Sequence, residues 1–170
     1  MGVIDELKST LGMGARANKY RVIINGVAGG PSGPEVDTLT KSASVPGRSF
    51  NEIEVWNQGR LTVIAGEADF GGTWSVTFMD DEKHTLRGKF IAWMEFIDSV
   101  AKHSSDASSH EDYVTTSELH QLSTVDNKPT AKYKFNDIWP KSISDSAMSD
   151  ESSEMIEFTV EFNYTSWEKI

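Results

Sequence analysis

Apolar and polar residues alternate most strictly near the end of the chain, in "EMIEFTVEFNYTSW", residues 154–167. Apolar or aromatic side chains occupy every second position, at Ile156, Phe158, Val160, Phe162 and Tyr164. Polar side chains fill the positions between them, at Glu157, Thr159, Glu161 and Asn163. A period of two predicts a β-strand with one face in a core and one hydrated face. The hydrated face carries two carboxylates, whose purpose the rest of the chain has to explain.

Other segments with β-strand composition precede this one, at residues 19–25, 36–45, 61–67, 71–79, 113–124 and 131–140. Together with the last segment they predict about seven strands. In residues 71–79, Trp74 and Phe78 fall on the same face, and we expect both in the core with Phe158 and Phe162. The fold class is therefore mainly β (α+β), a β-sandwich or barrel.

One long segment has helical spacing instead. Apolar residues recur at steps of three and four in residues 80–103, at Leu86, Phe90, Trp93, Ile97 and Val100. This stripe predicts an α-helix flanking the sheet, with Phe90 and Trp93 in the core and with Asp80 or Asp81 capping its start. The opposite face is polar and is expected to point outward, at Lys83, Arg87, Glu95, Asp98 and Lys102. Residues 1–14 form a short helical arm, and residues 15–170 form a single β domain.

The segment "PGRSFNEIEVWNQGR", residues 46–60, is bracketed by Pro46-Gly47 and Gln58-Gly59 and predicts a projecting hairpin or a long loop. It carries four large apolar side chains, at Phe50, Ile53, Val55 and Trp56. Large apolar groups on a projection usually mark a protein contact. We therefore expect this segment to dock on a neighbouring subunit.

The overall composition narrows the function classes. The chain has 170 residues and a net charge of −10, and so lacks the basic footprint of a nucleic-acid-binding protein. It has no cysteine, which excludes disulfides and thiolate zinc sites. No apolar run approaches the roughly 20 residues of a membrane span, and no signal peptide is evident, so the composition predicts a soluble intracellular protein.

Three groups of residues resemble chemical motifs, and each has a plainer interpretation. The Gly-rich "GVAGGPSGP" lacks the Lys-Ser/Thr of a phosphate loop and leads into a strand. Asp80, Asp81 and Glu82 precede the apolar stripe, where helix capping explains them. The third group could ligate a metal but matches no ligand spacing, at His103, Asp106, His110 and Asp112. We expect no catalytic, metal-binding or cofactor-binding residues.

Five motifs occur in an order that resembles the tail tube proteins of contractile-tailed bacteriophages: "ARANKYRV", "SVPG", "VIAGEADFGGTWSVTFMDDEKHTLRGKFIAW", "YKFNDIWP" and "EMIEFTVEFNYTSW". The resemblance covers residues 15–167. Its most specific parts are Ala65-Gly66 running into Phe70 and Trp74, "MDDEKH" leading into the helix, and the Trp-Pro pair at 139–140 before the last strand.

This resemblance implies a structural protein without catalysis, located in the tail tube of the virion and made in the bacterial host cytoplasm. It implies a fold shared with the hemolysin-coregulated ring protein of type VI secretion, and hexameric rings stacked into a tube. The implied partners are other copies of the chain, the tail sheath protein, and the baseplate tube-initiator and tail terminator proteins. The resemblance also implies a tape measure protein in the lumen of the tube, and viral DNA that passes through the lumen without specific binding. Glu157 and Glu161 would then line a negatively charged channel.

Two alternatives remain open at this point. A baseplate tube-initiator or a secretion-system ring protein belongs to the same structural class. A monomeric carbohydrate-binding module belongs to another class, and it also is a Trp-bearing acidic β-sandwich. Stacked rings of the purified protein would separate the first class from the second.

Overall fold

The structure is a computed structural model of the 170-residue chain and describes all residues except 1–2, 13, 103–108 and 150–152. The helices are α1 (Val3–Leu11), α2 (Pro34–Leu39), α3 (Thr85–Lys102) and a short 3-10 turn, η1 (His110–Asp112). The strands are β1 (Tyr20–Ile24), β2 (Thr40–Ala43), β3 (Ser49–Asn57), β4 (Arg60–Asp69), β5 (Thr73–Met79), β6 (Thr115–Leu122), β7 (Pro129–Ile143), β8 (Glu157–Asn163) and β9 (Ser166–Lys169). None of the described helices is long and apolar enough to span a membrane.

The fold is mainly β, as the sequence predicts, and is built on a seven-stranded sheet with the path β1-β6-β7-β8-β5-β2. The 15-residue strand β7 joins two halves of this sheet. Its first part pairs with β6 and β9, and its last part pairs with β8. Asp137, with φ of 53°, lies between the two parts. The end strands approach each other, since the Tyr20 hydroxyl donates to the Thr40 carbonyl over 3.3 Å.

The core lies between the two halves of the sheet and under α3. Trp74 stacks on Phe135 with ring centroids 4.3 Å apart, and Phe78 contacts Phe90 of α3 at 5.1 Å. The six aromatic residues expected in the core are all buried: Trp74, Phe78, Phe90, Trp93, Phe158 and Phe162. This aromatic layer fixes α3 and the sheet as one body, from which the remaining elements project.

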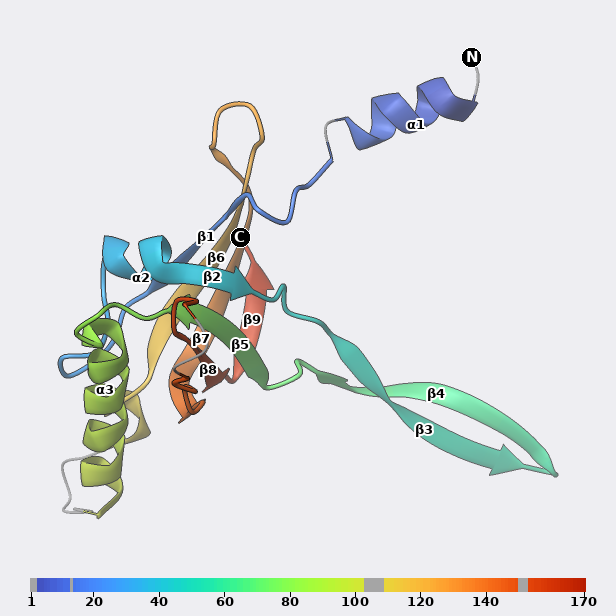
Figure 1. The fold of residues 1–170 in the computed structure, drawn as a ribbon. Coiled ribbons are helices and arrows are strands. Elements are labelled where there is room, and N and C mark those ends of the chain that lie inside the picture. The colour runs from blue at the N-terminus through green and yellow to red at the C-terminus, as the bar shows by residue number, and fades with distance from the viewer. Residues whose placement is uncertain (1–2, 13, 103–108, 150–152) are drawn as a thin grey trace.

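Two segments leave this body. Figure 1 shows α1 and the β3–β4 hairpin extending away from it in diverging directions. The hairpin forms a separate two-stranded sheet. Of the two alternatives for residues 46–60, the projecting hairpin is confirmed and the loop is wrong. Those residues supply only its first strand and its turn, and residues 61–67, expected as an independent strand, belong to its second strand. A two-residue turn joins the two strands, and Gln58 and Gly59 both adopt the positive φ that such turns require, 48° and 76°.

The strand predicted over residues 36–45 is only half right. Residues Pro34–Leu39 form α2, and only Thr40–Ala43 form a strand. Pro34 suits the first turn of a helix because its φ is already fixed near the helical value. Asp37 on α2 accepts hydrogen bonds from the Val22 amide and the Arg21 side chain, each over 3.2 Å. These contacts to β1 stabilise a helix that the β-branched residues alone would not predict.

Candidate assembly surfaces

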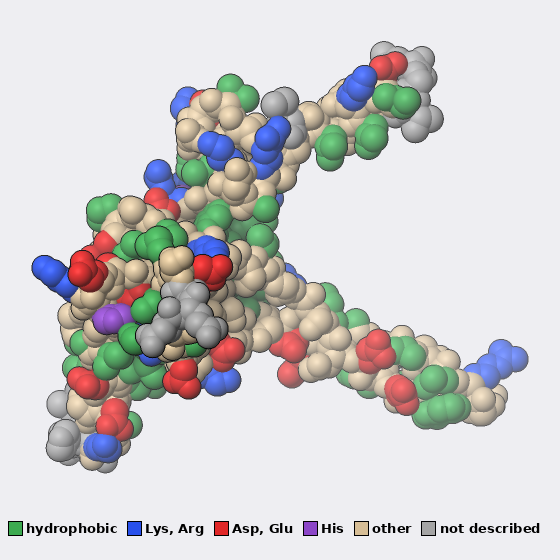
Figure 2. All heavy atoms as spheres, in the orientation of Figure 1, with side chains coloured by type: hydrophobic (Ala, Val, Ile, Leu, Met, Phe, Trp, Pro, Cys, Tyr) green, Lys and Arg blue, Asp and Glu red, His purple; other side chains and the backbone are tan. Residues whose placement is uncertain are grey.

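The β3–β4 hairpin holds many of the exposed large apolar side chains that the structure describes. Seven of its large apolar side chains are between 41% and 66% exposed: Phe50, Ile53, Val55, Trp56, Leu61, Val63 and Ile64. All four residues that the sequence assigns to an intersubunit contact are in this set. Figure 2 shows hydrophobic side chains along the hairpin, interrupted by carboxylates. Exposed apolar patches of this kind typically mark an interaction site.

The pairing register divides the hairpin into two unlike faces. Residues directly opposite each other share a face. One face, here called the Trp56 face, holds the pairs Glu52–Ala65, Glu54–Val63 and Trp56–Leu61. The other, here called the Ile53 face, holds Ile53–Ile64, Val55–Thr62 and Asn57–Arg60. Both faces carry large apolar groups, whereas a hairpin lying on one partner would keep one face polar.

The root of the hairpin is fixed to the body by aromatic side chains. The Trp167 indole donates to the Gly47 carbonyl over 2.9 Å, and the Trp74 indole donates to the Ser44 carbonyl over 2.8 Å. On the other strand, the Tyr164 hydroxyl donates to the Phe70 carbonyl. Burial, and then the carboxylate of Asp69, raise the pKa of Tyr164, so it remains a donor at neutral pH. The hairpin therefore leaves the body in a defined direction.

Arg48 completes this anchor. Its guanidinium lies 4.6 Å from the centre of the Phe70 ring and 5.1 Å from that of Trp167. Such cation–π contacts orient the cation and join the start of β3 to β9. The sequence does not predict this anchor, because an aromatic residue at the end of a strand does not reveal its partner.

Helix α1 presents a second apolar surface. Its side chains Ile4, Leu7 and Leu11 are all more than half exposed. Their spacing places them on one side of the helix. No described part of the body covers this side, and Figure 1 shows α1 standing away from the sheet. A nine-residue helix is marginal in water when nothing packs against its apolar side.

The polar face of β8 is the third surface, and it contains both carboxylates singled out in the sequence. Glu157 forms an ion pair with Lys41 of β2. Glu161 accepts a hydrogen bond from the Ser142 hydroxyl over 3.2 Å. Around them the face is rich in hydroxyls, and Thr77 and Thr159 hydrogen bond to each other over 2.9 Å. The sequence does not predict the Lys41 pair, because that lysine comes from another strand.

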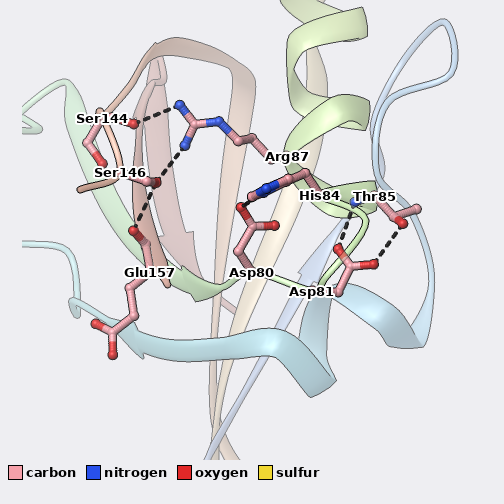
Figure 3. Close-up of polar contacts among 8 residues, drawn as sticks. All are labelled: Asp80, Asp81, His84, Thr85, Arg87, Ser144, Ser146 and Glu157. Atoms are coloured by element: carbon pink, nitrogen blue, oxygen red, sulfur yellow. Dashed lines mark hydrogen bonds and ion pairs between the residues drawn. The ribbon is translucent and has the colours of Figure 1, made fainter. Parts of the chain in front are cut away.

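The acidic group before α3 forms the helix start, as the sequence predicts. Asp81 accepts from both the amide and the hydroxyl of Thr85, each over 2.7 Å (Figure 3). The Thr85 hydroxyl is the main reason that the pKa of Asp81 is lowered. Asp80 takes a different role: it is buried and contacts His84 Nδ1 over 2.5 Å.

Arg87 does not point outward as the sequence predicts. The Arg87 guanidinium turns toward the chain that precedes β8. It donates to the Ser146 hydroxyl over 2.9 Å and to the Ser144 carbonyl over 3.1 Å. The Ser146 hydroxyl in turn donates to the Glu157 carbonyl over 3.2 Å (Figure 3). These contacts connect the start of α3 to the start of β8. These hydrogen bonds therefore have a structural role, because they hold α3 and β8 together.

Of the four possible metal ligands, His110 and Asp112 lie in the described part of the chain. His103 and Asp106 lie outside the described residues. His110 Nδ1 instead contacts the Tyr113 hydroxyl over 2.7 Å, and Asp112 accepts from the Ser109 amide. Within the described residues, no group of three or more His, Cys, Asp or Glu side chains could hold a metal ion.

Comparison with known protein families shows which structural class the chain belongs to. Residues 15–169 match the family described as phage tail tube protein. The chain belongs to this family. Two curated tail tube proteins, gp19 of Enterobacteria phages T4 and T6, are each 24% identical over 155 residues, which are 91% of this chain and 91% of each relative. As a tail tube protein, the chain is a structural component of the phage tail and not an enzyme.

Solved structures share the fold of this tail tube protein. A chain of the anti-feeding prophage baseplate aligns with a TM-score of 0.67 at 13% identity, covering 92% of this chain and 95% of that one. A chain of the extended sheath–tube complex of the PVC extracellular contractile injection system aligns with a TM-score of 0.63 at 9% identity, covering 100% and 99%. At these identities the likeness establishes the fold alone.

Proposed function

We propose that this tail tube protein forms closed hexameric rings, and that these rings stack into a tube through the β3–β4 hairpin. The observation that carries the proposal is the hairpin itself, which exposes seven large apolar side chains on two faces. A contact between different surfaces of identical subunits propagates without limit unless rotation closes it. A tube needs two such contacts. One closes the ring around the axis, and the other repeats from ring to ring along the axis.

The energetics of such a contact favour Trp56 as its centre. Tryptophan is enriched among interface residues that dominate binding, because it buries a large area with few rotatable bonds. Trp56 is 66% exposed and lies next to the turn of the hairpin. Leu61, directly opposite, widens the apolar patch. Burial of this pair would supply much of the stacking free energy.

The polar face of β8 is the proposed wall of the lumen. Glu161 has a hydroxyl partner and no cation within the described residues, so it contributes negative potential to this face. Glu157 contributes less, because Lys41 neutralises much of its charge. Phosphate is repelled from such a wall over roughly 8 Å at physiological salt. The surrounding hydroxyls hydrate the wall, and viral DNA then passes without specific binding.

Other partners are proposed from the neighbouring structures. One fold relative belongs to a sheath–tube complex, and another belongs to a sheath/tube terminator. By analogy, this chain meets a sheath protein on its outer side and a terminator and an initiator at its ends. The exposed side of α3 suits the sheath contact, since Glu95 and the Asp98–Lys102 ion pair lie on it. The proposal that a tape measure protein occupies the lumen rests on the family resemblance alone.

A baseplate position is a second candidate, because one of the fold relatives is a chain of a baseplate. The two functions differ in self-assembly. A tube subunit adds to copies of itself repeatedly, whereas an initiator ring stops after one layer.

Electron microscopy of the purified protein tests both proposals. We expect long tubes of stacked rings with an open bore from the wild type. Trp56→Ala should give folded subunits that form no tubes, with unchanged circular dichroism. The exposed Ile91→Ala on α3 is the matched control, and it should assemble normally. Single rings from the wild type would favour the baseplate position, and normal tubes from Trp56→Ala would refute the role of the hairpin.

A further inference from the structure

An apolar slot opens on the body where β1 and the end of β2 meet β6 and β7. Its walls include Tyr20, Ala43, Val45, Leu119 and Tyr133, and its volume is about 140 Å³. An apolar cavity of about 150 Å³ admits a benzene-sized ligand, so the slot has room for an aromatic ring or a branched aliphatic group. Val45 at the rim is 59% exposed. His120 and Gln121 also line the slot, which is therefore mainly apolar surface with a polar part.

The hairpin of the same subunit cannot fill this slot. β3 rises about 3.3 Å per residue, so Trp56 lies roughly 23 Å from Ser49, where the strand begins. Figure 1 shows the hairpin pointing away from the body over this length. The anchors at Gly47 and Phe70 hold both strands at the root. Trp56 can therefore reach a slot only on another copy of the chain.

The two surfaces carry opposite charges. Glu52 and Glu54 lie on the Trp56 face, and within the described residues neither forms an ion pair. At the slot, Lys169 of β9 pairs in register with Tyr133 and so lies on the same side of the sheet. Arg16 directly precedes Ala17, which lines the slot. Neither Lys169 nor Arg16 forms an ion pair in the part of the chain that the structure describes.

We propose that the slot of one subunit receives the Trp56 face of the hairpin from a subunit in the adjacent ring. The six-membered ring of the Trp56 indole enters the slot, Leu61 packs on Val45, and Glu54 faces Lys169. This inference rests on the proposed stacking function and names both sides of its contact. Because the donor and the acceptor are different surfaces, each added ring presents a new free surface, which is what a growing tube requires. The Ile53 face is left to contact a second neighbour.

Engineered cysteines test the contact directly, since the chain has none of its own. Leu61→Cys combined with Val45→Cys should form disulfides between subunits when assembled protein is oxidised. A ladder of cross-linked chains on a non-reducing gel is the expected result. Thr62→Cys with Val45→Cys is the matched control, because Thr62 is the next residue but lies on the Ile53 face. A ladder from the Thr62 pair and none from the Leu61 pair would overturn the assignment of the face.

Filling the slot provides a second test. Ala43→Phe should raise the critical concentration for tube growth about tenfold or more, because it excludes a dominant interface residue. Ala101→Phe, exposed on α3, is the control and should leave it unchanged. If Ala43→Phe does not fold, the cysteine pair decides alone. Intact tubes with no Leu61–Val45 cross-link would overturn this inference and leave the stacking function standing. Cross-linked oligomers without tubes would support the slot contact and overturn the proposed tube.

Discussion

Replacing Trp93 with Ala tests the attachment of α3 to the sheet. Trp93 is fully buried, and its indole donates to the Tyr113 carbonyl over 3.0 Å. Removing the ring leaves a cavity that a rigid aromatic core cannot close, and such truncations cost about 3–5 kcal/mol. The unpartnered Tyr113 carbonyl adds to that cost, which places the expected loss near the upper end. For a chain of this size, the melting temperature should fall by about 6–20 °C.

Urea unfolding of the subunit measures this loss. Assembly stabilises folded protein by mass action, so the comparison belongs in the non-assembling Trp56→Ala background. Ile91→Ala on the same helix is the control, because Ile91 is 41% exposed and should cost less than about 1 kcal/mol. A loss of that size for Trp93 as well would refute the reasoning that α3 depends on this residue for its attachment.

Three further predictions follow from charged residues. Glu157→Lys with Glu161→Lys should leave tube assembly intact but slow DNA ejection, because a basic lumen wall attracts phosphate; normal ejection by phage shown to contain the variant would place this face outside the lumen. Asp81→Ala should lower the melting temperature near neutral pH. The folded pKa of Asp81 lies below its ordinary 3.8, so its contribution is present above that pH, and the difference from wild type should shrink as the pH falls below it. Glu54→Lys and Lys169→Glu should each weaken tube growth, and their combination should restore it if the two side chains meet.

The sequence predicts best those elements whose periodicity and burial agree. β8 alternates strictly and lies in the middle of the sheet path, so its apolar face has only the core to enter. The apolar side of α3 likewise packs against a single aromatic surface of the sheet, which includes Phe78 and Phe158. In both cases local propensity and tertiary packing favour the same conformation. These two elements carry most of the aromatic core.

The hairpin was harder to predict because its pattern has no single buried side. Apolar residues lie on both faces, so residues 46–60 contain neither a clean alternation nor a loop composition. The turn at Gln58-Gly59 is a recognisable signal, since glycine tolerates a positive φ. Gly66 is a second one, because a Cβ there would lie only 2.9 Å from the Asn51 carbonyl oxygen. The slot could not be predicted at all, because its walls come from four strands and their flanking residues.

An isolated two-stranded hairpin is marginally stable in water, yet this one extends over the full lengths of β3 and β4. The aromatic anchors at its root and the tight turn at its tip constrain both ends. Such constraint lowers the entropy that docking must overcome, so more of the free energy of apolar burial remains for binding. The exposed residues then resemble half of a hydrophobic core, which becomes complete only when a second copy supplies the other half. A subunit built in this way keeps its own core closed and leaves a separate apolar surface for assembly.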